Sequence, residues 1–450
     1  MSLTSRRVWS STTSMAAAAA SLAATMAMVV SMTGCNQLFP SDVKGSGGAP
    51  GSAGSIGGNA QGGATGTGTV MKDPSTYPQN TAGAAFPFPQ GHTLAHCALP
   101  TYDTDKVALA YNNWKTKFYQ GGRVVRPENA NDTASEGIAY GMLIGVYMND
   151  RPLFDALWGY AHARLNGNGL MAWHYNSGGG QLDGGAATDA DQDMAWALLM
   201  ADKQWGGGAS GLPTYLSSAT TLIAAIWSHE VDQANGFVLK PGDNFGGASQ
   251  TNPSYFAPSY YRVFARVTGN TGWMSVVSSS YSILGRATGA NGLVPNWVNS
   301  QGVGVPGPGN DPNGVHFGYD ACRTPYRIAL DYCDNGDPNA KQYLDTIVGF
   351  FAGKIAGSGL GAIKDGYTIA GAAPPPPLGM YAAGMAFLGP GGVAAMDGGH
   401  DSFVADVYAT LVADTTTQLM NLNGVFSYFN GSWGVLSMLT MSGNFWNMAP

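Results

Sequence analysis

Three carboxylates in this sequence stand where apolar segments of helical length begin. Glu136 opens the segment that runs to Tyr147, Asp189 precedes an apolar run from Met194, and Asp320 lies just upstream of a Thr-Pro pair typical of a helix start. Only 11% of the 450 residues are charged, so acids in apolar stretches are poorly explained as solvated surface charge. If these segments form one ring of helices, the three carboxylates converge at one open end.

Converging carboxylates of this kind can hydrolyse a glycosidic bond. One carboxylic acid protonates the leaving oxygen, and a second carboxylate activates water or attacks the sugar carbon. Like charges close together raise one pKa, so a neighbouring Asp189 would keep Glu136 protonated, although a helix N-terminus alone favours the ionised form. No serine elbow, phosphate-binding glycine loop or zinc-ligand spacing in the sequence indicates a competing chemistry.

Glu136 also has a purely structural interpretation. With Thr133 as the helix cap, Glu136 falls at the capping-box position, and Ser135 is an alternative cap. Gly137 and Gly141 argue for more than a cap, because each glycine lowers helix stability by about 1 kcal/mol. Their missing side chains leave room for a ligand beside Glu136.

The other two carboxylates have structural alternatives as well. The three alternating aspartates that begin at Asp189 are similar to a calcium loop, but Met194 and Met200 stand where glycine and a bidentate glutamate are required. Thr188 is predicted to cap a helix whose first turn holds Asp189, where an acid also complements the helix dipole. For Asp320 the structural alternative is a buried ion pair with the two arginines that follow it.

The composition limits the classes of molecule that the protein can bind. With 21 basic and 28 acidic residues the net charge is -7 and the pI about 5.4, which excludes a nucleic-acid binder built on a basic patch. Hydrophobic residues make up 44% of the chain and aromatic residues 11%. A neutral polysaccharide fits this surface, because it needs no electrostatic steering.

The apolar runs predict an all-α protein. Several are apolar on every face, as expected for helices surrounded by other helices, and strand-like alternation is scarce. No composition shift divides residues 82–450, so we expect one large domain whose helices form two layers and close on themselves. The predicted helical runs are residues 138–147, 194–201, 260–267, 327–331 and 379–387.

The N-terminal region is predicted to direct export. Residues 1–35 combine two arginines with an apolar core typical of a signal peptide. Cys35 follows a glycine and resembles a bacterial lipobox, so it is either lipidated or removed by ordinary cleavage. Residues 36–81 form a predicted Gly/Ser-rich flexible linker, and residues 82–450 the catalytic domain. We expect a secreted protein or a lipoprotein attached to the bacterial outer membrane or cell surface.

The cysteines of the domain allow at most one disulfide. Cys322 and Cys333 would lie about 16 Å apart along one straight helix, beyond disulfide reach, which leaves pairing through Cys97 open. His92 and His96 beside Cys97 are a weak indication of a metal site, since no carboxylate lies nearby in the sequence. We expect neither a metal nor another cofactor.

Six stretches of the domain resemble a known family. In chain order they are ASEGIAYGML, ATDADQDMAWALLMADKQW, NPSYFAPSYYRVFA, GLVPNW, YDACRTPYRIALDY and LTMSGNF. They resemble glycoside hydrolase family 8, and most closely its bacterial endo-β-1,4-glucanase (cellulase) branch, from about residue 107 to residue 447. The resemblance implies an (α/α)6 barrel of six inner and six outer helices, with the catalytic cleft at one end and an inverting mechanism.

The resemblance also implies roles for the three carboxylates. By position in these motifs Glu136 is the general acid, Asp320 is the general base that activates water, and Asp189 holds and distorts the sugar ring at the cleavage subsite. Two positions depart from the family pattern, which has aspartate where this chain has Asn296 and tryptophan where it has Tyr326. Neither departure removes a catalytic carboxylate, but both can retune a subsite.

Aromatic rings are predicted to bind the sugars, because the apolar face of a pyranose stacks on a flat ring. The candidate platforms are Trp173, Tyr260, Trp297 and Tyr319, while Trp196 in a fully apolar run is assigned to the core. Arg323 is expected to orient Asp320 or a sugar hydroxyl. The expected partner is a β-1,4-linked polysaccharide bound by a monomer.

Other functions stay open at this point. Cellulose, carboxymethylcellulose and mixed-linkage β-glucan are the expected substrates, with xylan and chitosan as alternatives within the family. A catalytically silent, surface-tethered glycan-binding lipoprotein is the alternative outside enzymes. The sequence does not distinguish degradation of external glucan from trimming of a polymer that the cell makes itself.

Overall fold

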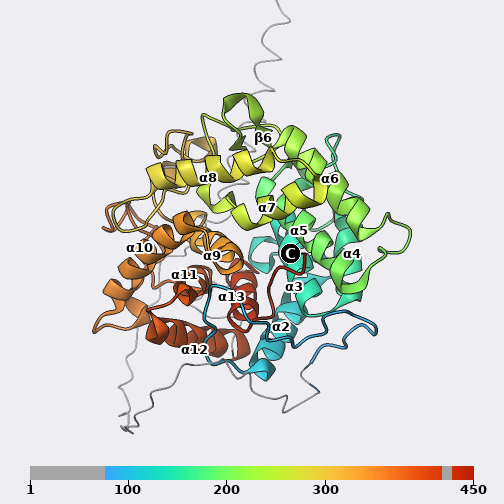
Figure 1. Cartoon of the computed structure of the whole chain (residues 1–450), viewed down its shortest axis with the longest axis horizontal. Coiled ribbons are helices and arrows are strands. Elements are labelled where there is room, and N and C mark those ends of the chain that lie inside the picture. Colours follow the sequence, from blue (N-terminus) through green and yellow to red (C-terminus); the bar gives the residue numbers. More distant parts are fainter. Residues whose placement is uncertain (1–74, 76, 418–427, 450) are drawn as a thin grey trace, which may run out of the picture.

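The computed structural model describes Ser75, residues 77–417 and residues 428–449, whose helices form two concentric rings (Figure 1). The inner helices place nearly all of their residues in the core where the sequence is apolar on every face, as in α3, α5, α11 and α13. The inner ring comprises α3 (Ser135–Tyr147), α5 (Thr188–Trp205), α7 (Pro258–Thr268), α9 (Thr324–Asn335), α11 (Met385–Ala394) and α13 (Tyr428–Met441).

The outer helices cover this ring and bury one face each. In α4, for example, Leu153, Phe154, Leu157 and Trp158 are buried while other positions meet solvent. The outer ring comprises α2 (Thr104–Phe118), α4 (Arg151–His162), α6 (Tyr215–His229), α8 (Trp273–Ala287), α10 (Pro338–Ile355) and α12 (Asp401–Thr417). The predicted two-layered all-α architecture is therefore confirmed.

Contacts between neighbouring inner helices close the ring. Helix α3 packs against α5 and α13, α9 packs against α7 and α11, and α11 packs against α13. The rings of Trp196 on α5 and Tyr260 on α7 stack with centroids 4.1 Å apart, which joins the remaining pair. The predicted core position of Trp196 is confirmed, since it is 1% exposed.

Short antiparallel strands lie between the helices. Strand β3 (Thr133–Ala134) pairs with β4 (Ala172–Tyr175), which pairs with β5 (Gln181–Ala186). Strand β3 leads directly into α3 and β5 leads into α5, so the sheet fixes the chain where these two helices begin. The other pairs are β1 (Tyr119–Gln120) with β2 (Arg123–Val124) and β6 (Val231–Asp232) with β7 (Val238–Leu239).

Four of the five predicted helical runs are confirmed, in α3, α5, α7 and α9. The prediction for residues 379–387 is wrong over most of its length, because α11 begins only at Met385. Gly379 has a left-handed backbone (φ 77°), and Ala382 pairs with Lys364 in an isolated β-bridge. A left-handed residue and a bridge partner are both incompatible with a continuing helix.

The predicted threonine caps are wrong. Helices α3 and α5 have Ala134 and Ala187 at their N-cap positions, without a side-chain hydrogen bond. The hydroxyl of Thr133 instead donates to Val124 O at 2.9 Å, and that of Thr188 donates to Lys240 O at 2.7 Å. Each hydroxyl therefore links the start of a helix to the backbone of a neighbouring segment.

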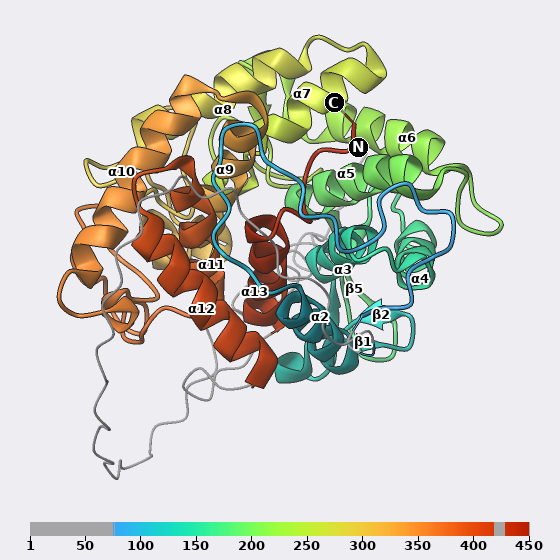
Figure 2. The same cartoon turned by 60° about the horizontal axis from the view of Figure 1, so that its bottom comes forward.

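The N-terminal segment of the domain crosses the barrel (Figure 2, blue) and is tied to the C-terminal ends of inner helices. A disulfide joins Cys97 to Cys333 on α9, and Cys322 is a buried free thiol. The ring of His92 stacks on Trp446 at 3.8 Å. Pairing through Cys97, which the sequence left open, is the arrangement observed.

The predicted signal segment, including Cys35, and nearly all of the predicted linker lie outside the described residues. The contacts of the domain start slightly before residue 82, because the Tyr77 hydroxyl donates to Asp105 at 2.8 Å and Thr81 N donates to Asn149 O. None of the described helices combines the length and the apolar character that a membrane crossing requires.

Candidate active site

The three predicted carboxylates line one pocket at the N-terminal ends of inner helices. Glu136 lies in the first turn of α3, Asp189 lies in the first turn of α5, and Asp320 immediately precedes the short 3-10 helix η8 (Ala321–Arg323) that leads into α9. Helix N-termini carry partial positive charge, so they attract the carboxylates that gather here. The three carboxylates, which are far apart in the sequence, therefore lie in one pocket as predicted.

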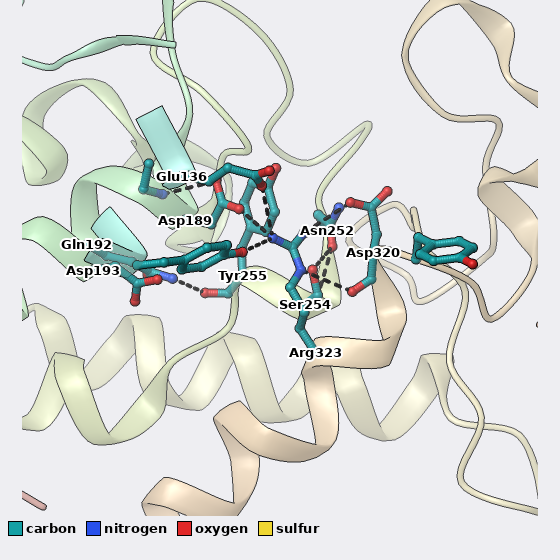
Figure 3. Close-up of polar contacts among 12 residues, drawn as sticks. Glu136, Asp189, Gln192, Asp193, Asn252, Ser254, Tyr255, Asp320 and Arg323 are labelled. Carbon is teal, nitrogen blue, oxygen red and sulfur yellow. Dashed lines mark hydrogen bonds and ion pairs between the residues drawn. The ribbon is translucent and has the colours of Figure 1, made fainter. Parts of the chain in front are cut away.

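Arg323 connects the three carboxylates (Figure 3). Its Nη1 donates to Asp189 Oδ2 at 2.6 Å, and its Nη2 donates to Asp320 Oδ1 at 3.0 Å. Glu136 Oε2 lies 3.6 Å from Nη1, beyond an ordinary hydrogen bond. Arg323 is 2% exposed, so its charge acts on all three groups with little screening by water.

The shared guanidinium limits the distance between Glu136 and Asp320. The terminal nitrogens of a guanidinium are about 2.3 Å apart, so contacts of 3.6 Å and 3.0 Å keep the two carboxylate oxygens within about 9 Å. Inverting glycosidases place their carboxyl groups about 6.5–9.5 Å apart to admit one water, and retaining enzymes about 5–5.5 Å. An upper limit of about 9 Å admits the inverting separation and also the shorter retaining one, so the anomeric configuration of the product decides between them.

The environment of Glu136 favours its protonated form. Burial and, next, the Asp189 charge raise its pKa to about 7, against the opposing effects of Arg323 and Arg126. A carboxylic acid of this pKa holds its proton at mildly acidic pH and can donate it to a leaving group.

Asp320 is held differently. Burial raises its pKa above the ordinary value, whereas Arg323 lowers it and a hydrogen bond from Trp297 Nε1 to Asp320 Oδ2 (3.0 Å) acts in the same direction. The two carboxyl groups therefore differ in the partners that act on their charge. Glu136 has only cations beyond hydrogen-bond distance, Arg323 and Arg126, while Asp320 accepts hydrogen bonds from Arg323 and Trp297 that favour its charged form.

Comparison with known proteins identifies the family. The model of glycosyl hydrolases family 8 matches residues 87–438, most of the domain. The chain belongs to glycosyl hydrolases family 8. The predicted (α/α)6 barrel is the fold of this family, and the resemblance noted in the sequence is confirmed.

Named relatives in family 8 are similar over most of their length. "Endoglucanase A" of Acetivibrio thermocellus is 37% identical over 388 residues, which are 82% of this chain and 76% of the relative. "Endoglucanase 2" of Ruminiclostridium josui is 40% identical over 333 residues, or 72% and 67%. The solved apo structure of β-1,3-1,4-glucanase from Paenibacillus sp. X4 matches with TM-score 0.70 and 30% identity, covering 80% of this chain and 99% of that one.

Two of the four predicted aromatic platforms line the family 8 pocket, and two do not. Trp173 and Trp297 are lining residues. The prediction for Tyr260 is wrong, because its ring is fully buried against Trp196 inside the barrel. Tyr319, half-buried beside Asp320, packs edge-on against Phe387 and is not among the residues that line this pocket, so its role as a platform stays a prediction.

Several lining residues were missed by the sequence analysis. Tyr255 lies in a segment noted for its resemblance, but the ring chosen there was Tyr260. Arg126 forms two hydrogen bonds with Asp132, which also contacts His174 at 2.8 Å. The sequence signal that could have identified Arg126 is its charge, because charged residues are rare in this chain. Further lining residues include Asp183, Asn244, Phe245 and Asp311.

Within the described residues, no group of three or more His, Cys, Asp or Glu side chains is arranged to hold a metal ion. The Cys97 thiol beside His92 and His96 is used in the disulfide. The pocket is lined by acids, Arg126 and aromatic rings, which suit hydrolysis by proton transfer.

Proposed function

We propose that the protein is an endo-acting, inverting β-1,4-glucanase in which Glu136 is the general acid and Asp320 the general base. The observation that carries this proposal is the pair of carboxyl groups beside Arg323, with Glu136 at 3.6 Å from one nitrogen and Asp320 at 3.0 Å from another. Burial raises the pKa of both groups, but their hydrogen-bond partners differ, and this difference assigns acid and base. Glu136, with a pKa of about 7, takes the acid role, and Asp320, with two charge-stabilising donors, takes the base role.

The reaction follows from these positions. Glu136 gives its proton to the glycosidic oxygen as the bond to the anomeric carbon breaks. Asp320 accepts a proton from a water that attacks the same carbon from the opposite face, which inverts its configuration. After product release the proton on Asp320 returns to solvent, and Glu136 takes one up.

Asp189 has a supporting role in this proposal. Its Oδ2 accepts the 2.6 Å bond from Arg323, and its Oδ1 accepts from Ala190 N at 3.0 Å. It therefore orients Arg323 and raises the pKa of Glu136. We also propose that Asp189 binds the sugar ring at the cleavage subsite and holds it in a distorted conformation.

The substrate class rests on the pocket and on the relatives. Trp173, Tyr255, Phe245 and Trp297 supply apolar ring surface for stacking neutral sugars. Relatives named endoglucanase and β-1,3-1,4-glucanase support β-glucan, and xylan is the weaker alternative.

The test is reducing-end release from carboxymethylcellulose, mixed-linkage β-glucan, xylan and chitosan. We expect the highest rate on a β-glucan, with a rapid fall in viscosity that marks internal cleavage. Glu136→Gln, which keeps the shape of the side chain, is expected to lose hydrolysis and to retain the melting temperature and glycan binding. Full turnover by this variant would contradict the acid assignment, and a preference for xylan would contradict the substrate.

Export is a further part of the proposal. The N-terminal sequence supports a secreted enzyme or a lipoprotein anchored through Cys35, with residues 36–81 as the tether. Fractionation of cells that express the whole chain, with Cys35→Ser as the comparison, distinguishes the two. Anchoring predicts that the wild type sediments with membranes and the variant does not. Size-exclusion chromatography tests the expected monomer.

A further inference from the structure

Asn296 lies beside the proposed base without reaching the pocket. Its side chain is 7% exposed and makes three hydrogen bonds. Oδ1 accepts from Gly318 N at 3.0 Å and from Ala321 N at 2.9 Å, and Nδ2 donates to Asn313 O at 3.1 Å. One amide group thus joins the segment before η8 to Asn313 in the 3-10 helix η7 (Pro312–Val315).

The two backbone groups held by Asn296 flank Asp320. Gly318 precedes it by two residues and Ala321 follows it directly. The next residue along the chain, Trp297, donates its indole N–H to the Asp320 carboxylate at 3.0 Å. Asn296 and Trp297 therefore both hold Asp320. Asn296 binds the backbone on each side of it, and Trp297 binds its carboxylate.

Close packing shows that this contact is specific. A Cβ atom on Gly318 would lie 2.9 Å from Asn296 Nδ2, closer than such atoms approach each other in folded proteins. The glycine therefore allows the amide to reach the backbone. A buried amide whose donor and acceptor are both satisfied also fixes one orientation of the segment.

We propose that Asn296 is a positioning residue for the general base: by holding the backbone on both sides of Asp320, it aims the carboxylate at the attacking water. This inference rests on the proposed function. Positioning of this kind is worth a large factor in rate, because a misplacement of about 1 Å can lower turnover by about 100-fold.

The amide chemistry suits this place better than a carboxylate would. An aspartate could accept from both N–H groups, but when ionised it has no donor for Asn313 O. It would also add negative charge near Asp320, which already faces Asp189 from α5 and Glu136 from α3, balanced by Arg323. The neutral amide holds the backbone and leaves that balance unchanged.

The test begins with Asn296→Ala. We expect kcat to fall by about 10- to 100-fold while KM changes by less than about 3-fold, because the pocket walls remain in place. The acidic limb of the kcat/KM profile should move to higher pH, since looser contacts with Trp297 and Arg323 stabilise the ionised base less. Asn296→Asp, which keeps both acceptor contacts, should recover most of the lost kcat at its optimum.

Asn299 offers a matched control. Its Oδ1 also accepts from two backbone groups, Gln301 N (3.0 Å) and Val303 N (3.1 Å), in a loop away from the carboxylates. Asn299→Ala is expected to keep wild-type kcat and the wild-type pH profile. If Asn296→Ala does not fold, Gly318→Ala supplies the test, because its Cβ displaces the same amide and should produce the same loss and pH shift.

Two results would overturn the proposal. One is a folded Asn296→Ala enzyme with wild-type kcat and an unmoved acidic limb. The other is an Asn296→Asp enzyme no better than Asn296→Ala at any pH. Asp320→Asn, measured in parallel, separates this inference from the proposed function. If that variant stays active, the base assignment itself fails; if it is inactive while Asn296→Ala is normal, only the positioning role fails.

Discussion

Glu136 keeps its proton near neutral pH because burial and the Asp189 charge outweigh two arginines. The enzyme needs this proton, so kcat/KM should decline as pH rises through about 7, the pKa of Glu136. Its acidic decline should follow the protonation of Asp320, whose pKa is also raised above its usual range. A bell-shaped profile of this kind reports the acid and the base together.

Asp189→Asn tests the electrostatic part of this account. Removing the Asp189 charge removes an effect that raises the pKa of Glu136, and it frees Arg323 to stabilise ionised Glu136. Both changes lower the pKa of Glu136. The alkaline limb of kcat/KM should therefore move to lower pH, and the maximal rate should fall by about 10-fold or more.

Asp193→Asn is the matched control, one helical turn further along α5. Asp193 Oδ2 accepts from Arg327 at 2.7 Å, and both residues are about 1% exposed. Leaving Arg327 without its charge partner should lower the melting temperature. The alkaline limb should stay where it is in the wild type. An equal shift of the limb in both variants would contradict a specific effect of Asp189.

Residue types alone were enough to predict the carboxylates of the pocket, but not every aromatic ring that lines it. Glu136, Asp189 and Asp320 stood out because acids are rare in apolar runs. Tyr255 and Tyr260 belong to one aromatic segment, and nothing in their types separates them. The difference arises because Tyr255 ends a short 3-10 turn ahead of α7, which begins at Pro258, so only Tyr260 lies within the helix that faces α5.

At the scale of elements, two buried acids lie where α5 and α6 pack against each other. Asp191 on α5 and Glu230 at the end of α6 are both 0% exposed, and Asp191 Oδ2 and both Glu230 carboxylate oxygens lack a hydrogen-bond partner. Burial and, next, the charge of Asp191 raise the pKa of Glu230, so we expect one of the two acids to hold a proton. Burial raises both pKa values well above the ordinary range. Asp191 also accepts from Met171 N at 3.1 Å, next to β4.

This pair predicts that stability depends on pH. Groups whose pKa is raised by folding contribute fully below the unfolded pKa, about 4, and the contribution is lost as pH rises through the folded value. Glu230→Gln replaces one acid of the pair with an amide that does not titrate. Its melting temperature relative to wild type should therefore increase steadily from pH 4 to pH 8.

Asp345→Asn is the control for this series, since its side chain is 55% exposed. Its melting temperature relative to wild type should vary little with pH. If the Glu230→Gln difference is as constant with pH as that of the control, folding does not raise the pKa of Glu230.

Helices could be predicted from the sequence more fully than strands or loops. Runs apolar on every face, as in α3 and α5, are long enough to indicate a buried helix. The strands around the pocket are short, and β3 spans only Thr133–Ala134, too few residues for alternation to appear. In residues 379–387 the composition is apolar, but the left-handed Gly379 ends any helix there.

For the whole molecule, the disulfide fastens the N-terminal segment to the end of the barrel away from the pocket. Cys333 lies at the C-terminal end of α9, about 14 Å along the helix from Thr324. The bridge closes a loop with a sequence separation of 236 residues. Cysteine spacing could not predict this pairing, because only the closed ring brings Cys97 and Cys333 together.

Cys333→Ser should lower stability without changing catalysis. Loss of a bridge across so long a loop removes about 3 to 5 kcal/mol of unfolding free energy in the chain-entropy account, so the melting temperature should fall by several degrees. The kcat should stay at the wild-type value, because Asp320 and Arg323 precede the opposite end of α9. Reductant should destabilise the wild type and leave the variant unaffected; equal stability of both proteins without reductant would contradict this role.

The most direct test of the whole account follows the anomeric proton of the first product. Cleavage of a soluble β-glucan oligosaccharide is monitored by proton NMR before mutarotation mixes the anomers. If Glu136 and Asp320 face each other across a gap that admits one water, the new reducing end appears first as the α anomer. First appearance of the β anomer would mean that a carboxylate attacks the sugar carbon, and it would contradict the role of Asp320 as the base.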